Sequence, residues 1–125
     1  MSNSERISHI LLEVSNLEKS TKFYQEILGF EILSKEKMKD KRDLVVFKQG
    51  IGLTSVMDMN QKNLNYSSPL NHIGVKINDI NLLITKLDSA KVKIIEGPNA
   101  SAYGTKLYIL DPDGIRIECH DKFRI

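Results

Sequence analysis

Apolar and polar residues alternate in two short stretches of the chain, one near its start and one past its middle. Residues 8–14 and 71–77 each place apolar side chains at every second position. A period of two is typical of a half-buried strand, because successive side chains point to opposite faces. His9 in the first stretch and His72 in the second have the opposite parity to the apolar positions. We therefore expect two equivalent strands whose histidines point away from the hydrophobic core.

A helical pattern follows each of these strands. After the first, Ser15 opens a segment with capping-box spacing, apolar residues recur at helical intervals, and Gly29 ends the pattern. After the second, Asp79 can cap a helix that ends near Lys91. The two halves are thus expected to carry one helix each, at equivalent places.

Three further strand-like segments follow each helix. They are 30–34, 44–48 and 51–57 in the first half and 93–95, 106–110 and 115–120 in the second. We interpret residues 98–105 as a mobile surface loop or as a lid over a cleft. The order βαβββ occurs twice, which predicts an α+β fold built from a repeated unit.

The length of 125 residues suits one domain that contains both copies of the unit. We expect module 1 to cover about residues 6–59, a linker to cover 60–69, and module 2 to cover about 70–122. The predicted architecture is an open eight-stranded mixed sheet. One of its faces would be lined by polar side chains, so a partner is expected to close its cleft or edge, which favours a dimer.

Composition and charge exclude several classes of protein. With 41% hydrophobic and 27% charged residues the chain is not disordered, and no apolar run approaches the ~20 residues of a membrane span. The net charge is +2, and the basic patch at 35–42 contains no aromatic residue, so we expect a solvated hairpin loop and no nucleic-acid binding. A polar N-terminus and the single Cys119 favour a cytoplasmic protein.

Three residues of metal-ligand type occupy matched positions of the repeat. Glu118 follows His72 at nearly the same distance as Thr54 follows His9, and its parity is opposite to the apolar residues of its strand. Two imidazoles and one carboxylate form a facial triad that leaves coordination positions open. A solvent-facing strand residue would explain either histidine alone. The coincidence of His9, His72 and Glu118 predicts a site for one divalent ion.

Three residues near Glu118 are candidates for roles of their own. Tyr108 has the parity of the site and is the candidate catalytic residue that orients substrate through its hydroxyl, although a half-buried strand tyrosine fits the pattern equally well. His120 can support the site, but an exposed position near the C-terminus is the expectation. Cys119 has core parity and is expected to be buried and not a nucleophile.

Several motifs together resemble the glyoxalase/bleomycin-resistance/dioxygenase proteins of the vicinal oxygen chelate superfamily. The opening resembles theirs at His9, 14–20, 23–24 and 28–30, and the closing strand pair resembles theirs at 108–118, Tyr-Ile-Leu-Asp-Pro-Asp-Gly-Ile-Arg-Ile-Glu. The likeness covers roughly residues 6–121. It implies paired βαβββ modules around a metal-containing cleft, the three ligands predicted above, and a homodimer.

The resemblance implies an enzyme acting on a small substrate with vicinal oxygens, but it leaves the reaction open. A glyoxalase-like lyase or isomerase with Ni, Zn, Co or Mn is the first expectation, although Thr54 stands where glyoxalase I enzymes have a glutamate that is ligand and base. An extradiol-type dioxygenase with Fe(II) is an alternative, although residues 98–103 lack its catalytic histidine. Fosfomycin-resistance thiol transferases typically have threonine where this chain has Leu11. A metal-free binding protein is the last alternative.

Overall fold

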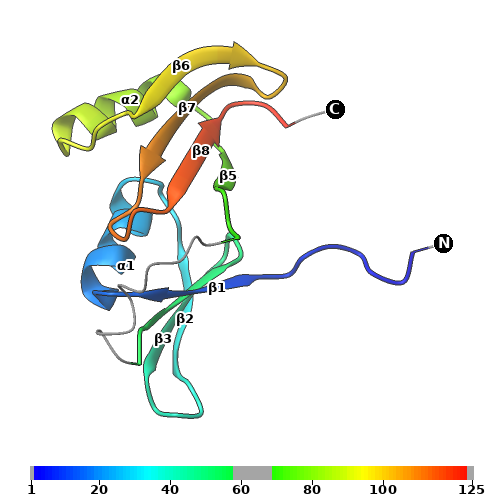
Figure 1. The fold of residues 1–125 in the computed structure, drawn as a ribbon, viewed down its shortest axis with the longest axis vertical. Coiled ribbons are helices and arrows are strands. Elements are labelled where there is room, and N and C mark those ends of the chain that lie inside the picture. The colour runs from blue at the N-terminus through cyan, green and yellow to red at the C-terminus, as the bar shows by residue number, and fades with distance from the viewer. Residues whose placement is uncertain (1, 58–68, 124–125) are drawn as a thin grey trace. The chain divides into compact units, whose positions relative to one another are not determined.

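The computed structural model describes residues 2–57 and 69–123, and the chain divides into two compact units, Met1–Leu64 and Asn65–Ile125 (Figure 1). Each unit runs from a strand through a helix to three further strands. The repeated βαβββ order and the α+β class are thereby confirmed. The predicted linker, apart from residue 69, lies outside the described residues.

The first unit contains one four-stranded sheet and one helix. Its elements are β1 (Ile10–Val14), α1 (Leu17–Glu26), β2 (Ile32–Lys37), β3 (Asp43–Phe47) and β4 (Ile51–Ser55). The strand order is β1-β4-β3-β2, with β1 parallel to β4 and the other neighbours antiparallel.

The second unit repeats this arrangement. Its elements are β5 (Ile73–Lys76), α2 (Ile80–Ser89), β6 (Glu96–Ser101), β7 (Gly104–Leu110) and β8 (Arg116–His120). The order β5-β8-β7-β6 again pairs the first and last strands in parallel. The eight strands are therefore hydrogen-bonded as two four-stranded sheets.

The predicted cap of α2 is confirmed, whereas α1 is capped by Asn16 and not by Ser15. The Asn16 side chain accepts from the backbone N–H of Lys19, one residue after the predicted start, and the Asp79 side chain accepts from Leu82 at 3.0 Å. Each helix is 10 residues long. In the part of the chain that the structure describes, neither the length nor the apolar character of any helix suffices to span a membrane.

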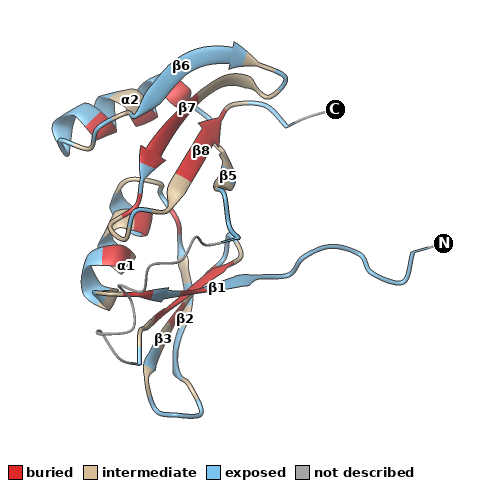
Figure 2. Cartoon of the chain, viewed as in Figure 1, coloured by how far each residue is buried: buried red, intermediate tan, exposed pale blue. Residues whose placement is uncertain are grey.

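Both the strands and the helix of each unit supply its buried side chains. Unit 1 centres on the rings of Tyr24, Phe30 and Phe47, which lie 5.6–6.1 Å apart between centroids. In unit 2 the buried apolar side chains come from α2, β7 and β8, which Figure 2 shows in red. Tyr108 on β7 and Glu118 on β8 have the opposite parity to Leu107, Ile109, Ile117 and Cys119, and they belong to the candidate site.

The segment at 98–105 is not the loop that the sequence predicts. Residues Glu96–Ser101 form β6, which pairs antiparallel with β7, and the strand expected at 93–95 lies outside it. Gly97 and Pro98 hide the strand from sequence analysis because both disfavour a regular ladder. Pro is nevertheless tolerated in an edge strand, and the register shifts between Glu96 and Asn99.

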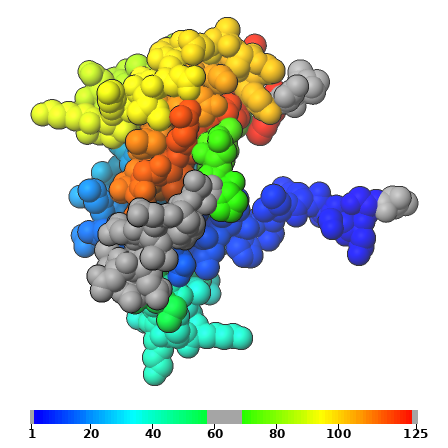
Figure 3. Space-filling model, viewed as in Figure 1, coloured from blue at the N-terminus to red at the C-terminus, as the bar shows by residue number. Residues whose placement is uncertain are grey.

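The basic patch at 35–42 is only partly a loop. β2 continues to Lys37, and the tip of the β2–β3 hairpin projects into solvent (Figure 3). The Arg42 guanidinium is mostly covered and donates to Glu13 Oε2 at 2.7 Å and to the Ser55 carbonyl at 2.6 Å. One member of the patch thus anchors the hairpin to β1 and β4.

Candidate metal centre

The register of the second sheet brings polar residues from three strands together. Glu118 on β8 pairs with Tyr108 on β7 and with Gly74 on β5. His72 lies one residue before β5. Since paired residues share a face of the sheet, Tyr108 and Glu118 point to the same side, opposite to the buried Cys119.

His72, Tyr108 and Glu118 converge on one carboxylate oxygen. His72 Nε2 lies 3.0 Å from Glu118 Oε2, and the Tyr108 hydroxyl donates to the same oxygen at 2.9 Å. Glu118 and Tyr108 are only 6% and 8% exposed. The structure thus brings together two predicted ligands and the predicted catalytic tyrosine.

The side chain of Asn71 favours a proton on Nδ1 of the His72 ring. His72 Nδ1 lies 2.7 Å from Asn71 Oδ1, and an amide oxygen only accepts, so Nδ1 is the donor. In a neutral imidazole, Nε2 then has a lone pair, and this lone pair faces the carboxylate oxygen at 3.0 Å. Two acceptors at this distance need a cation between them, which is either a proton on Nε2 or a metal ion.

This donor set fits a divalent ion. Nitrogen and oxygen ligands lie about 2.1 Å from such ions, so two ligands at a right angle are about 3.0 Å apart. His72 Nε2 and Glu118 Oε2 already have that separation. Among residues 2–57 and 69–123, however, no three or more His, Cys, Asp or Glu side chains come together as a metal site.

The third predicted ligand belongs to the other unit. His9 directly precedes β1, is exposed, and has its Nδ1 3.0 Å from Ser8 Oγ. The structure therefore joins His72 with Glu118 and describes His9 within unit 1.

The Tyr108 phenol keeps its proton at neutral pH. Burial, followed by the hydrogen bond to Glu118, raises the pKa of Tyr108 above its ordinary value. Two cations also lie against its ring, with Arg116 Cζ 4.4 Å and Lys106 Nζ 5.5 Å from the ring centroid. Arg116 is itself paired with Glu96 at 3.0 Å. Tyr108 is therefore a hydrogen-bond donor whose ring contacts two cationic side chains.

The position in unit 1 that corresponds to Glu118 is Gly52, and the assignment of Thr54 to it is wrong. Gly74, two residues after His72, pairs with Glu118, whereas Leu11, two residues after His9, pairs with Gly52. Thr54 lies two residues further along and corresponds to His120. Equal spacing from the two histidines points to Thr54 instead of Gly52 because the segment between the paired strands is shorter in the first half.

Among the described residues of unit 1, none at or beside this position is free to act as a ligand or a base. Gly52 has no side chain, and a Cβ built there would lie 3.3 Å from a methyl carbon of Leu11. Thr54 is fully buried and donates its hydroxyl proton to the Asp43 carbonyl at 2.7 Å. Glu13 on the neighbouring strand is ion-paired with Arg42.

Cys119 and His120 follow Glu118 on β8. The prediction for Cys119 is confirmed and the prediction for His120 is wrong. Cys119 is buried as expected, and burial raises the pKa of its thiol to about 12, so it is not a nucleophile at neutral pH. His120 is not exposed as expected but only 8% exposed, because the Tyr103 ring covers it at 4.8 Å between centroids. Its parity, which equals that of Glu118, was the signal that sequence analysis underweighted.

The Asp-Pro-Asp-Gly motif has a structural role. Asp111 is buried, and its Oδ1 accepts from the backbone N–H groups of Asp113 and Ile115, both at 2.9 Å. Gly114 adopts a φ of 86°, which favours glycine. This turn delivers β8, and with it Glu118, in a fixed register beside β7.

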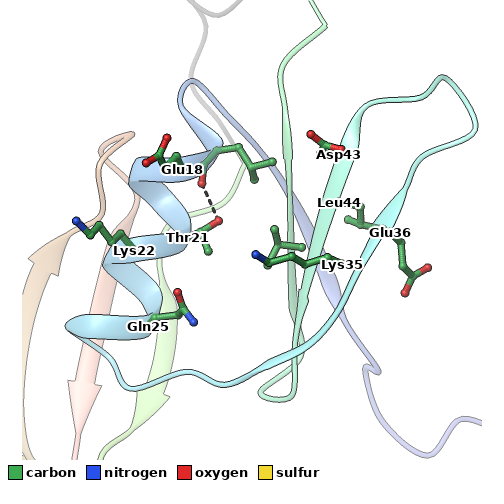
Figure 4. Close-up of a pocket in the computed structure, with 10 residues that line it drawn as sticks. Glu18, Thr21, Lys22, Gln25, Lys35, Glu36, Asp43 and Leu44 are labelled. Carbon is green, nitrogen blue, oxygen red and sulfur yellow. Dashed lines mark hydrogen bonds between the residues drawn. The ribbon is translucent and has the colours of Figure 1, made fainter.

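A cavity of about 620 Å³ lies elsewhere, between α1 and the β2–β3 hairpin of unit 1 (Figure 4). Its polar lining residues are mostly exposed and of mixed charge, including Glu18, Lys22, Gln25, Lys35, Glu36 and Asp43. It contains no pair of metal-ligating side chains comparable to His72 and Glu118, and we assign no chemistry to it.

The chain belongs to the Glyoxalase/Bleomycin resistance protein/Dioxygenase superfamily, whose family model matches residues 6–119. This match covers both βαβββ units and confirms the family resemblance seen in the sequence.

Two relatives of known sequence and one solved structure are similar to the chain over most of its length. A probable lactoylglutathione lyase of Vibrio parahaemolyticus is 27% identical, over 94% of this chain and 91% of its own. The metallothiol transferase FosB of Lysinibacillus sphaericus is 31% identical, over 93% and 82%. The trypanothione-dependent glyoxalase I of Leishmania major has a TM-score of 0.77 at 27% identity, over 95% of this chain and 88% of that one. The glyoxalase-like fold is thereby confirmed.

Proposed function

We propose that this chain is a divalent-metal-dependent enzyme acting on a small substrate that chelates the metal through vicinal oxygens. The observation that carries the proposal is the approach of His72 Nε2 to Glu118 Oε2 at 3.0 Å, with His72 Nδ1 turned to Asn71 Oδ1 at 2.7 Å. His9 is proposed as the third ligand, on the strength of its matched place in the repeat. The relatives named as a lyase and a metallothiol transferase support an enzyme.

Each residue of the site has a distinct part in this proposal. A bound Ni, Zn, Co, Mn or Fe ion would supply Lewis-acid polarisation of a substrate oxygen. Asn71 holds the His72 ring through Nδ1, so that Nε2 is presented in a fixed direction. Tyr108 stays protonated and donates, to Glu118 in this structure and, in the proposal, to an oxygen of the substrate.

Glyoxalase-like lyase or isomerase chemistry is the first candidate reaction, supported by the relatives of that name. Such a reaction moves a proton between neighbouring carbons, and Gly52 supplies no base for it. We therefore expect the proton to be carried by a group other than a protein carboxylate at this position.

Thiol transfer is a second candidate, and Gly52 is the observation that favours it. In this reaction a thiolate sulfur bonds to an electrophilic carbon, the carbon–oxygen bond breaks, and the released alkoxide takes a proton. No protein base is needed at the Gly52 position, and the 31% identical relative is named a metallothiol transferase. Leu11, where fosfomycin-resistance enzymes typically have threonine, argues for a different electrophile.

The metal content of the purified protein tests the proposal directly. Protein prepared without chelators should contain about one equivalent of a transition metal by mass spectrometry, and His72→Ala and Glu118→Ala should lose it, because each removes one of few ligands. Glu96→Ala is the matched control: it removes a carboxylate of the same sheet that is paired with Arg116, and it should retain the metal.

The control also separates ligand loss from a general electrostatic effect. If all three variants lost the metal equally, the site would not be the one proposed. If the wild type neither retained nor took up any metal, a metal-free binding protein would replace the enzyme as the leading function.

The two reactions are distinguished by their products. The metal-loaded protein is given glutathione with a 2-oxoaldehyde, and separately glutathione with an epoxide. Formation of a thioester identifies the isomerase, and formation of a thioether identifies the transferase. An iron-selective protein that cleaved catechols in the presence of oxygen would instead support the dioxygenase alternative.

Two further proposals follow from the family and the chain. We propose a homodimer, since the edge strands β1, β2, β5 and β6 leave backbone groups without a sheet neighbour in the described residues. We also propose a cytoplasmic location, supported by a single cysteine that is buried and forms no disulfide.

A further inference from the structure

His120 is a buried imidazole that none of the roles above uses. It is the last residue of β8, lies on the same face as Glu118, and is only 8% exposed. Its Nδ1 is buried and, within the described residues, has no partner at hydrogen-bonding geometry. A buried polar atom of this kind is normally paired, so its surroundings indicate what it is for.

The nearest carboxylate oxygen belongs to the proposed metal ligand. His120 Nδ1 lies 3.4 Å from Glu118 Oε1, whereas the other oxygen, Oε2, is the one contacted by His72 and Tyr108. Charge-assisted N–H···O bonds are about 2.7–2.9 Å long, so a small rotation of the carboxylate closes the gap. The two oxygens of Glu118 thus have different neighbours, His120 for Oε1 and the pair His72 and Tyr108 for Oε2.

The packing around His120 fixes the direction of its ring. Tyr103 stacks on it at 4.8 Å between centroids, with the planes tilted by 39°. On the neighbouring strand Gly74 leaves room for it, since a Cβ at that position would lie 3.3 Å from His120 Cε1. Tyr103 is tied down in turn, because its backbone N–H donates to Ser101 Oγ and its carbonyl accepts from Lys122.

We propose that His120 is a positioning residue: its Nδ1–H donates to Glu118 Oε1 and sets the rotation of the carboxylate, so that Oε2 is presented beside His72 Nε2. The inference rests on the proposed function, in which Oε2 is a metal ligand. Supporting hydrogen bonds of this kind orient carboxylate ligands, and their loss weakens metal binding.

Two substitutions of His120 separate the hydrogen bond from the packing. His120→Asn places an amide N–H where Nδ1 stands, and His120→Phe keeps a ring against Tyr103 but has no donor. The readout is the dissociation constant of Zn²⁺ for the metal-free full-length protein, measured by competition with a chromophoric chelator. We expect Phe to weaken binding about 10–100-fold and Asn to remain within about threefold of wild type.

Either of two results would overturn the positioning role. One is unchanged Zn²⁺ affinity in His120→Phe, and the other is an equal loss in both variants, since a merely structural histidine would not be rescued by asparagine. Circular dichroism and thermal melting of each variant verify that it folds.

A measurement without metal keeps the inference separate from the proposed function. In nitrogen-15 spectra of the metal-free wild type, the His120 Nδ1–H proton should be protected from exchange, and it should shift in Glu118→Gln. Protein that binds no Zn²⁺ but shows this bond would refute the metal function alone. Protein that binds Zn²⁺ but carries the His120 proton on Nε2 would refute the positioning role alone.

Discussion

Cys119 occupies a place on β8 between two polar residues but points to the opposite face. Its side chain is fully buried among apolar neighbours, and the pKa of its thiol is about 12 because burial disfavours the thiolate. In the unfolded chain the thiol ionises near its ordinary pKa of about 8.5. The folded state therefore holds its proton over a range of pH in which the unfolded state has released it.

The free energy of unfolding should consequently depend on Cys119 at alkaline pH. The stability that the protonated thiol contributes is fully present below about pH 8.5 and is lost as pH rises towards the folded pKa, at up to about 1.4 kcal/mol per pH unit. Urea denaturation of wild type and Cys119→Ala between pH 8 and 11 measures this. Tyr108 titrates in both proteins, so the difference isolates the thiol. Parallel curves for the two proteins would contradict the prediction.

At this scale, residue parity allowed much of the site to be predicted. His72, Tyr108 and Glu118 were placed on one face because each stands opposite to an apolar neighbour, and the structure joins them. Gly52 could not be found in this way. A glycine has no side chain whose polarity marks its face of the strand. The segment between β1 and β4 also differs in length from its counterpart, and this shifts the apparent equivalent by two positions, to Thr54, which has the same parity as Gly52.

The first residue of each helix is set by one capping side chain at its N-terminus. Asp79 accepts a hydrogen bond from Leu82 N–H, and Asn16 accepts one from Lys19 N–H, both at 3.0 Å. These bonds pair backbone donors that have no partner within the helix. Asp79 is the predicted cap, whereas Asn16 caps α1 in place of the predicted Ser15, because two short polar residues stand side by side before that helix.

Replacing a cap should destabilise the fold by a measurable amount. Asp79→Ala is expected to lower the free energy of unfolding by about 1 kcal/mol, because the first turn of α2 loses its acceptor. The matched control is Asp88→Ala, which removes an exposed carboxylate from the same helix without removing a cap. Chemical denaturation of the two variants provides the comparison. A loss of similar size in the control would mean that charge, not capping, is responsible.

Strands were predicted less evenly than helices. The central strands β4, β7 and β8 carry apolar residues at alternate positions, and the predicted segments overlap them closely. β6 was missed because Glu-Gly-Pro-Asn-Ala-Ser has no apolar alternation. It is a strand because β7 offers it backbone partners, and that information lies elsewhere in the chain.

The proposed ligands are divided between the two units, with His9 in unit 1 and His72 and Glu118 in unit 2. An ion that all three bind would link the stabilities of units that otherwise have their own sheets and cores. A ligand at 100 times its dissociation constant stabilises the state that binds it by about 2.7 kcal/mol.

Hydrogen exchange should reveal this linkage. Saturating Zn²⁺ is expected to slow amide exchange in both β1 and β8 of the wild type, by up to about 100-fold. In His9→Ala the protection should be confined to unit 2, where His72 and Glu118 remain. Protection of β1 that persisted in His9→Ala would show that unit 1 responds to metal without His9, and it would exclude His9 as the third ligand.

The register correspondence between the sheets carries an evolutionary consequence. Equivalent positions hold Leu11 and Gly74, Leu44 and Lys106, Val46 and Tyr108, Gly52 and Glu118, and Thr54 and His120. At most of them the first copy is apolar or small, whereas the second is ionisable or hydroxyl-bearing. The two copies of the unit thus share one backbone arrangement but differ in chemistry on this face of their sheets. Substitutions at these positions of the first copy leave the side chains of His72, Tyr108 and Glu118 in place, so the two copies can change independently of one another.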